Sequence, residues 1–513
     1  MSQESRVKKS LLNARVNLIF YFLTLALSFF SRKIFLDCLG ADFVGLTGTL
    51  QNLLGFLNLA ELGIGSAIGY VLYKPLFDHD EAKINEIISV FGYLYRWIGR
   101  IILGAGCILA CFLPLIFPDT PFELSIIFFA YFAFLASSLI GYFANYKQTL
   151  LGADQKNYVV TAYFQTANII KTLIQMVSAY YTGNYYLWVV IELAFGIIYS
   201  FILNWKINQV YPWLKTEVKQ GKLLFKKYPE VMRYTKQLFV HKIAGIVQNQ
   251  TTPFLTYAFV SLQMVAYYGN YTIITDKISL LISNLLGRTG AGVGNLIAEG
   301  KREKTIVVFW ELISIRFFIS GIFSFALFNL LPAFISLWIG KEYILPENIL
   351  ILLIISFFIS ITRGATDQFI FGYGLFYDTW APITESIIYI VIAIIGGHFY
   401  GLGGIIMGGI ISRTIIIGIW KPYFLFSKGF QMPIWKYWIN WLKYLFLIII
   451  PFPILTYFIR NYNYQLNNWS NWILFAIIIT ISYSALCYIL LFIGTKGMRS
   501  FSKRFIPKII NIS

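Results

Sequence analysis

The stretch GYFANYKQTLLGADQKNYV, residues 141–159, has a counterpart in ATDQFIFGYGLFYDTW, residues 365–380. Two residue pairs align at an offset of 220 positions: Gln148 with Gln368 and Gly152 with Gly372. Each stretch ends an apolar run and continues into a polar loop. The recurrence predicts that the chain contains two related halves.

A second short match supports the same interpretation. SAIG at residues 66–69 resembles AGVG at residues 291–294, at an offset of 225 positions. Both tetrapeptides lie near the end of an apolar run. Similar offsets at equivalent places are the weak internal symmetry that is typical of membrane transporters.

The composition places this chain in the membrane. Of its 513 residues, 58% are hydrophobic and only 12% are charged, whereas a soluble domain carries about 25% charged residues. A transmembrane helix needs about 20 apolar residues. Fourteen runs satisfy this requirement, at residues 14–36, 43–72, 88–116, 122–146, 158–181, 185–205, 237–261, 264–297, 306–334, 347–372, 380–397, 401–424, 441–460 and 471–494.

Basic residues indicate the orientation of these spans. With the N-terminus inside, the inner segments hold 29 of the 41 Lys and Arg, including nine from Lys206 to Lys242 and five from Lys496 to Lys508. The outer loops hold four: Arg32, Lys33, Lys341 and Arg460. By the positive-inside rule both termini are expected in the cytoplasm. The net charge of +18 is then explained by topology and anionic lipid, and we expect no nucleic-acid partner.

The repeat and the span count together predict an all-α integral membrane protein with two six-helix bundles. Six is an even number, so the bundles form a parallel repeat with its axis along the membrane normal. The expected domains are an N-terminal bundle (1–205), a cytoplasmic amphipathic linker (206–236), a C-terminal bundle (237–424), and helices 13 and 14 with a basic cytoplasmic tail (425–513). No cleavable signal peptide is expected, because the first apolar run has no small-residue cleavage site.

Eight cationic side chains lie inside the predicted spans. A charged group at the centre of a bilayer costs about 2.5–3.5 kcal/mol, so such residues normally face a partner charge or a watery interior. The eight are Arg96, Arg100, Lys171, Lys277, Arg288, Arg316, Arg363 and Arg413. A cationic interior in a membrane protein indicates an anionic cargo.

The segment SRKIFLDCLGADFVGLTGTLQNLLGFLNLAELGIGSAIGYVLYKPL (31–76) and the LLGADQ loop resemble bacterial polysaccharide repeat-unit flippases. These O-antigen flippases of the Wzx type belong to the multidrug/oligosaccharidyl-lipid/polysaccharide exporter superfamily, and the fourteen-span pattern is similar to theirs. The resemblance implies that undecaprenyl-pyrophosphate-linked oligosaccharide is flipped from the cytoplasmic to the outer leaflet of the bacterial inner membrane. It implies no enzyme activity, alternating access between two bundles, a role in lipopolysaccharide synthesis, and transient contact with a polymerase.

Three alternatives remain open. Peptidoglycan lipid flippases of the same superfamily share the span count and a cationic cavity. Multidrug antiporters are expected to use acidic residues, and here cations outnumber acids inside the spans by eight to six. A membrane polysaccharide polymerase or ligase is less expected, because such enzymes use a large outer loop and no predicted outer loop here exceeds about a dozen residues.

Several cations are candidates for binding the pyrophosphate, because Arg and Lys bind phosphate oxygens through charge-assisted hydrogen bonds. Lys277 and Arg288 are eleven residues apart and share one helix face. Arg32 and Lys33 lie at the expected outer end of the first span. The full set of candidates is Arg288, Lys277, Arg316, Lys171, Arg32, Lys33 and Arg100.

The same cations also have structural interpretations. Arg96 and Arg100 can extend to the inner surface, as can Arg32 and Lys33 to the outer one. Local acids offer ion pairs to Lys277, through Asp276, and to Arg363, through Asp367, and Glu385 on the preceding span can pair with Arg413. Glu311 lies five residues before Arg316, a less suitable spacing for a pair, which leaves more room for a functional role. Lys171 has no acid near it in sequence.

Glu61 and Asp276 are the candidates for binding a coupling ion, H⁺ or Na⁺, since carboxylates inside membranes commonly serve as relays. The alternative for Glu61 is a pair with an arginine of the cavity. No other cofactor is expected. The four cysteines form no CxxC pair and no zinc spacing, and no catalytic triad or phosphate loop is present. Asp78-His79-Asp80 matches a nucleotide-sugar transferase motif only superficially, because no nucleotide-binding domain surrounds it.

Overall fold

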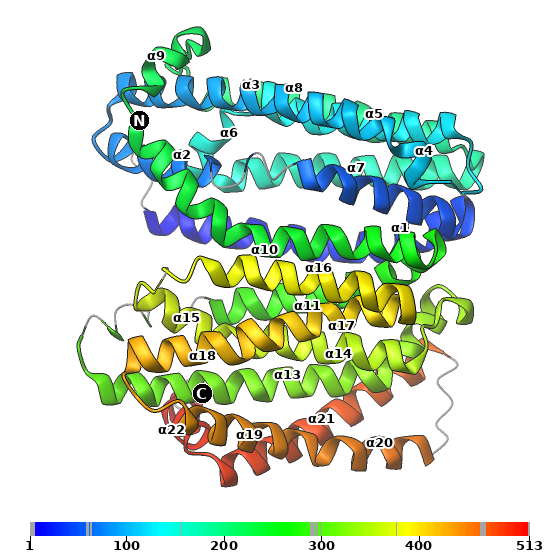
Figure 1. Ribbon diagram of the computed structural model, residues 1–513, viewed down its shortest axis with the longest axis vertical. Coiled ribbons are helices and arrows are strands. Elements are labelled where there is room, and N and C mark those ends of the chain that lie inside the picture. The colour runs from blue at the N-terminus through cyan, green and yellow to red at the C-terminus, as the bar shows by residue number, and fades with distance from the viewer. Residues whose placement is uncertain are drawn as a thin grey trace. The chain divides into compact units, whose positions relative to one another are not determined.

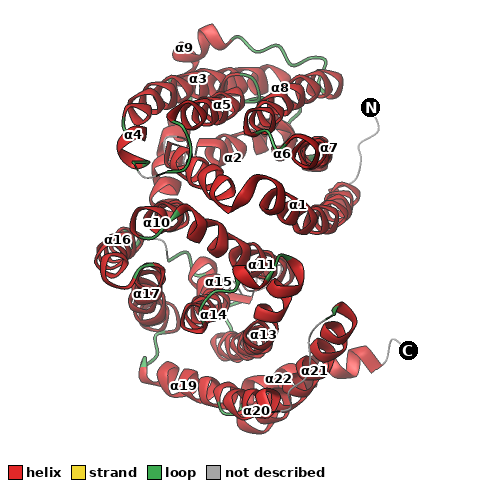
Figure 2. Ribbon diagram, turned by 90° about the vertical axis from the view of Figure 1, so that its right-hand side faces the viewer, coloured by secondary structure: helices red, strands yellow, loops and turns green. Residues whose placement is uncertain are grey.

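The computed structural model describes residues 6–510, except 58–60, 62–63, 119, 155, 288–292, 294–295, 298, 376 and 462–467. The described residues form helices joined by loops, with no strand among them (Figures 1 and 2). The helices divide into two compact units, residues 1–266 and 267–513. The boundary between the units falls inside helix α11 (Leu262–Gly287).

The first unit contains the long helices of the N-terminal half and a short connecting segment. Its elements are α1 (Arg6–Leu57), α2 (Ile64–Phe77), α3 (Glu81–Cys111), α4 (Leu113–Ile116), α5 (Leu124–Phe143), α6 (Gln148–Ala153), α7 (Asn157–Thr182), α8 (Tyr185–Val210), the 3₁₀ turn η2 (Val218–Gln220), α9 (Gly221–Phe225) and α10 (Pro229–Phe259). Helix α10 begins inside the expected linker and packs on α1 and α2.

The second unit contains the remaining helices. After most of α11, its elements are α13 (Arg302–Trp338), the 3₁₀ turn η3 (Lys341–Tyr343), α14 (Glu347–Thr362), α15 (Gly364–Gly372), α16 (Trp380–Tyr400), α17 (Leu402–Arg413), the π-helix η4 (Thr414–Trp420), α18 (Lys421–Phe424), the π-helix η5 (Leu425–Phe430), α19 (Trp435–Ile449), α20 (Pro451–Asn461), α21 (Trp469–Gly494) and α22 (Lys496–Ile510).

The predicted spans correspond to helices in the structure. Ten helical stretches in the described part of the chain are long and apolar enough to cross a membrane. One of them is the 43-residue stretch Arg15–Leu57 of α1, which at about 1.5 Å per residue is roughly twice the thickness of the hydrocarbon core. It is interrupted at Gly40, whose φ of 83° and ψ of 159° are not helical. Helices α2, α7, α10 and α11 lie at the other four predicted spans, so the fold class is confirmed.

The two quoted stretches fold alike, which supports the repeat. In each unit a membrane-length helix is followed by a short one, α5 by α6 and α14 by α15, and then by a loop that leads into the next long helix. Gln148 begins α6, and Gln368 lies within α15. The local element order is therefore shared by both halves.

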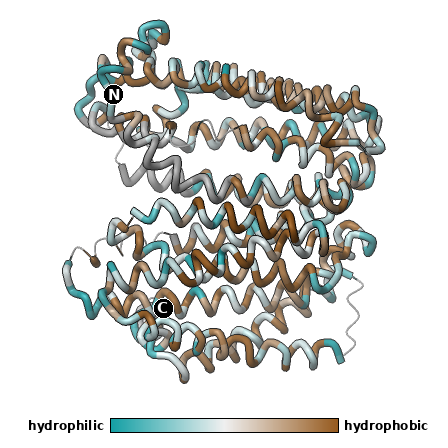
Figure 3. The backbone as a smooth tube through the Cα atoms, viewed as in Figure 1, coloured by the Kyte–Doolittle hydropathy of each residue, from teal (hydrophilic) through white to brown (hydrophobic). Residues whose placement is uncertain are grey.

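Hydrophobic residues follow the middles of the helices, whereas hydrophilic residues collect at their ends and in the loops (Figure 3). The backbones of α16 and α17 are in direct contact. A Cβ atom added at Gly404 would lie 1.9 Å from the carbonyl oxygen of Gly396. Small residues at such contacts are how helices associate in membranes, where no hydrophobic force drives them together.

Candidate functional site

Lys171 on α7 is paired with an acid on the neighbouring helix. Its Nζ lies 2.7 Å from Oε1 of Glu192 on α8, and the two side chains are 17% and 20% exposed. Nε2 of Gln175 donates to the other carboxylate oxygen of Glu192 at 3.0 Å. Lys171 therefore belongs to a partly buried network of three residues, which sequence separation did not reveal.

Arg32 and Lys33 near the middle of α1 face different surroundings. Nη2 of Arg32 donates to the carbonyl oxygen of Ala266, in the first turns of α11, at 2.9 Å. Lys33 lies 3.6 Å from Asp37 one helical turn later, and both side chains are about half exposed. Lys33 is thus the more accessible of the two to an incoming anion.

Arg96 and Arg100 lie on an exposed face of α3. The guanidinium of Arg100 lies over the ring of Trp97, 5.4 Å from its centroid. A cation over an indole face at this distance is attracted by the ring quadrupole. Of the site candidates in the first unit, Arg100 and Lys33 have the most exposed side chains.

Glu61 is held by two tyrosine hydroxyls. Tyr95 on α3 donates to Oε1 of Glu61, and Tyr142 on α5 also hydrogen-bonds this carboxylate. A carboxylate between two phenol donors is satisfied without a cation, which suits a group that exchanges a proton or a small ion. No sequence signal marked either tyrosine as its partner.

The second unit gathers three cations and three carboxylates. Nε of Arg363 and Oδ2 of Asp367 are 2.7 Å apart, which confirms the predicted i, i+4 pair. Arg413 donates to Oγ of Ser356 at 2.8 Å and interacts electrostatically with Glu385, as predicted. The cluster comprises Asp276 and Lys277 on α11, Arg363 and Asp367 beside the α14–α15 junction, Glu385 on α16 and Arg413 on α17.

Arg316 on α13 is almost fully buried at that junction. It is 6% exposed, and its Nη1 donates to the carbonyl oxygen of Ile361 at 3.2 Å. Its Nε has no hydrogen-bond partner among the described residues. A Cβ atom at Gly364 would lie 2.3 Å from Nη1, so only glycine leaves room for the guanidinium here. Arg288 lies outside the described residues.

Glu311 does not face Arg316, contrary to one structural interpretation above. Its carboxylate is 2% exposed and accepts hydrogen bonds from Oγ of Ser500 at 2.5 Å and Nη1 of Arg504 at 3.0 Å. Both donors lie on α22, the basic C-terminal helix. The basic tail is therefore docked on α13 through a buried charge.

The repeated loops each place an aspartate against the end of a long helix. In the first unit, Asp154 accepts from the hydroxyl of Tyr211 at 2.8 Å and pairs with Lys156 at 2.7 Å. Burial, and then the Asp154 carboxylate, raise the pKa of Tyr211, so this hydroxyl remains a donor at neutral pH. Sequence alignment of the two loops did not pair this aspartate with its counterpart.

Asp378 is the counterpart in the second unit. Its Oδ2 accepts hydrogen bonds from Nζ of Lys421 at 2.6 Å and from Nε1 of Trp420 at 3.1 Å. Both donors lie on the helical stretch that follows α17. The side chain of Asp378 is 1% exposed, and its Oδ1 has no partner within the described ranges. Each unit thus uses a loop carboxylate to hold the end of its sixth span.

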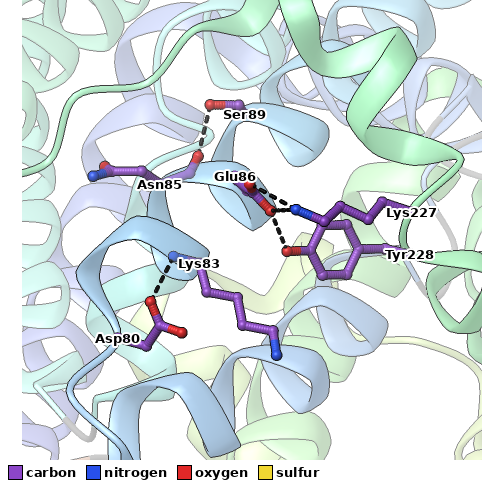
Figure 4. Close-up of polar contacts among 7 residues, drawn as sticks. All are labelled: Asp80, Lys83, Asn85, Glu86, Ser89, Lys227 and Tyr228. Atoms are coloured by element: carbon purple, nitrogen blue, oxygen red, sulfur yellow. Dashed lines mark hydrogen bonds and ion pairs between the residues drawn. The ribbon is translucent and has the colours of Figure 1, made fainter.

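The segment after α8 is anchored on the first turns of α3 (Figure 4). Glu86 accepts from Nζ of Lys227 at 2.8 Å and from the hydroxyl of Tyr228 at 2.7 Å. The backbone N–H groups of Lys215 and Glu217 donate to Asn85 and Ser89, each at 2.9 Å. The predicted surface linker is therefore packed on protein along much of its length.

Within the described ranges, no three His, Cys, Asp or Glu side chains gather in a geometry that would hold a metal ion. Asp80 of the Asp-His-Asp motif instead caps α3, accepting from the backbone N–H of Lys83 at 3.0 Å (Figure 4). The motif has a local structural role at this helix end.

No family model matches this chain, and no curated protein matches it by sequence. Three solved structures share its fold. A lipid II flippase, MurJ, in an inward closed conformation has a TM-score of 0.61 at 15% identity, over 92% of this chain and 98% of that one. An inward-facing multidrug resistance MATE family transporter of the MOP superfamily has a TM-score of 0.62 at 15% identity, over 81% and 98%.

The third structure is an aspartate-to-asparagine variant of VcmN, a MATE transporter of Vibrio cholerae. It has a TM-score of 0.51 at 14% identity, over 83% of this chain and 99% of that one. At these identities the likeness concerns the fold. The likeness extends over 98–99% of these three chains, so this chain shares their helical fold.

Proposed function

We propose that this protein flips undecaprenyl-pyrophosphate-linked oligosaccharide repeat units from the cytoplasmic to the outer leaflet of the inner membrane. The observation that carries the proposal is a fold shared with a lipid II flippase over 92% of the chain, combined with cations placed along the spans. The resemblance of residues 31–76 to repeat-unit flippases supports this cargo. Both termini are cytoplasmic in this proposal, because the inner segments hold most of the basic residues.

In this proposal the cations have different roles in binding the pyrophosphate. Lys33 and Arg100 are accessible on the first unit, and Lys277 adds a charge from α11. The charge of Lys171 is balanced by Glu192, so Lys171 is not a direct ligand in this proposal. Arg316 is bonded to a backbone carbonyl, so it contributes positive potential to the interior more than a direct contact. A pyrophosphate passing these groups exchanges hydration for charge-assisted hydrogen bonds.

Deleting the gene tests the proposal as a whole. We expect lipid-linked repeat units to accumulate in the inner leaflet and surface polysaccharide to disappear, with both effects reversed by the wild-type gene on a plasmid. Normal surface glycan in the deletion strain contradicts a repeat-unit flippase.

Lys277→Ala is expected to reduce the flipping rate at least about tenfold. A hydrogen bond from a charged donor is worth about 1.5–3 kcal/mol, and each 1.4 kcal/mol corresponds to a factor of ten. The measurement is surface polysaccharide per cell at matched protein abundance. Lys341→Ala, which removes an exposed lysine of η3, is the control and is expected to retain the wild-type rate. Equal activity of the two variants would contradict a role of Lys277 in binding the pyrophosphate.

A second candidate cargo is a peptidoglycan lipid precursor, because one solved structure that shares the fold, over 92% of this chain, is a lipid II flippase. Complementation separates the two cargoes. A chain that flips peptidoglycan precursors restores growth to cells depleted of their own lipid II flippase, whereas a repeat-unit flippase restores only surface polysaccharide.

Glu61→Gln is expected to abolish the dependence of transport on a pH gradient if H⁺ is the coupling ion. The glutamine carbonyl oxygen still accepts from a tyrosine hydroxyl and its N–H can donate to the other tyrosine oxygen, but the side chain cannot take up or release a proton. Flipping is measured in proteoliposomes with and without an imposed gradient, and Asp276→Asn is compared in parallel. An unchanged response to the gradient in E61Q excludes Glu61 as the proton site, and a loss of Na⁺ stimulation in its place assigns it to Na⁺.

A further inference from the structure

The first unit contains a cavity of about 380 Å³ between α5, α6, α7 and α8. Its polar lining consists of Ser137, Asn145, Gln148, Thr161 and Gln165. The cavity lies toward the helix ends that meet the loop between α6 and α7, which is the expected cytoplasmic side. Its volume falls within the range of small-molecule sites.

Among the residues that the structure describes, no Lys, Arg, Asp or Glu lines this cavity. The side-chain oxygen of Asn145 is already hydrogen-bonded, since it accepts from Ser200 at 2.7 Å and from Asn204 at 3.1 Å. The side chains of Gln148, Thr161 and Gln165, by contrast, have no hydrogen-bond partner in the part of the chain that the structure describes. The cavity therefore offers free donors and acceptors without a net charge.

Two aromatic rings, together with Ile140 and Val160, form the apolar part of the lining. Phe164 on α7 and Tyr199 on α8 also line the cavity, and their rings meet edge to face with centroids 5.1 Å apart. The face of an aromatic ring carries negative partial charge and attracts polarised C–H groups. Rings beside amide side chains suit a ligand with one C–H face and a polar rim.

These features select a chemical class of ligand. A phosphate or ammonium group would enter without a counter-charge from the lining side chains, so the hydration it gives up there would not be replaced by an ion pair. A hydrocarbon chain would leave three polar side chains unpaired, which is also unfavourable. A neutral pyranose ring satisfies both constraints, because its hydroxyls bond amides and its C–H face packs on aromatic rings.

We propose that this cavity binds a neutral sugar of the lipid-linked cargo on the expected cytoplasmic side, while the cations outside it hold the pyrophosphate. The inference rests on the proposed function and adds a subsite that recognises the glycan. Flippase selectivity for glycosylated carrier over bare carrier would then arise from Gln148, Thr161 and Gln165.

Gly141 offers a direct test, because it lines the cavity and a Cβ atom added there meets nothing within 4 Å. Gly141→Leu places a side chain in the cavity without a backbone clash. Gly152→Leu is the matched control, since Gly152 on α6 also has open space around an added Cβ but does not line the cavity. Gln165→Leu removes one of the free amides at nearly constant volume.

The binding of two probes to the purified full chain is measured: undecaprenyl pyrophosphate, and the same lipid carrying one N-acetylglucosamine. We expect the wild type and G152L to bind the glycosylated lipid at least about tenfold more tightly, a difference of about 1.4 kcal/mol. G141L and Q165L are expected to lose this preference while binding the bare lipid as before. Should G141L fail to fold, Q165L alone decides the point.

The outcomes separate this inference from the function on which it rests. A wild type that binds both lipids equally, or a Q165L variant that keeps the full preference, overturns the sugar subsite and leaves the flippase proposal standing. A wild type that binds neither lipid overturns both.

Discussion

Replacing Lys421 by methionine is expected to lower the free energy of unfolding by about 3–5 kcal/mol, because it leaves a buried carboxylate without its counter-charge. The side chain of Asp378 is 1% exposed and Lys421 is 14% exposed, with 2.6 Å between Nζ and Oδ2. After the substitution, Nε1 of Trp420 is the remaining donor to the Asp378 carboxylate among the described residues. The measurement is the midpoint of thermal unfolding of the full chain in one detergent.

Lys428→Met is the matched control, since Lys428 lies on the next turns of the same span and is exposed. Its expected effect is within about 0.5 kcal/mol. Adding Asp378→Asn to K421M is expected to recover most of the loss, because the remaining buried group is then neutral. If K421M and K428M unfold at the same temperature, the pair contributes nothing measurable and the interpretation of this contact is wrong.

Removing α22 by truncation after Thr495 is the second change with a large expected effect, about 3–5 kcal/mol. The truncation strips both donors, Ser500 and Arg504, from the carboxylate of Glu311, which is 2% exposed. It also removes Met498 of α22, which is 1% exposed and belongs to the same apolar core as Phe309 and Ile313 of α13. The same thermal unfolding experiment gives the result.

Single substitutions measure how much each contact of α22 contributes to the stability that truncation removes. Arg504→Ala is expected to cost about 1.5–3 kcal/mol, less than truncation because Ser500 still donates and the Arg504 side chain is 43% exposed. Lys503→Ala, on an exposed position of the same helix, is the control. Glu311→Gln in the truncated chain is expected to restore part of the lost stability. A truncated chain as stable as the full one would show that α22 is not held by this contact.

The helices and their repeat could be predicted from the sequence because both depend on short stretches of neighbouring residues. Runs of about 20 apolar residues identify spans whatever their neighbours, and the shared positions of Gln148 and Gln368 identify the repeat. The Arg363–Asp367 pair was also readable, since residues four apart on a helix are adjacent by geometry alone.

The contacts between helices could not be predicted from the sequence in the same way. Lys171 and Glu192 lie on successive helices 21 residues apart, and Ser500 lies 189 residues from Glu311. Periodicity shows which face of a helix is apolar but not which helix packs against it. The π-helical stretches η4 and η5 likewise have no local signature in TIIIGIW and LFSKGF.

The candidate site was predicted as a set of cations, and the structure places most of them in relation to partners. Lys171, Arg363 and Arg316 are bonded inside their own units. The tyrosines that hold Glu61 and the neutral cavity among α5 to α8 were missed, because tyrosine and glutamine are common in membrane proteins and carry no spacing signal. Charge was the visible feature in the sequence, and neutral hydrogen-bonding groups were not.

The break at Gly40 inside α1 has a consequence for how this sequence varies over evolution. Its φ of 83° and ψ of 159° fall in a backbone region that essentially only glycine enters. An added Cβ meets no atom within 4 Å there, so the restriction comes from the backbone and not from crowding. Gly48 also has open space, but in regular helix. A library of all substitutions at both positions, selected for surface polysaccharide, is therefore expected to recover only glycine at 40 and alanine or serine as well as glycine at 48.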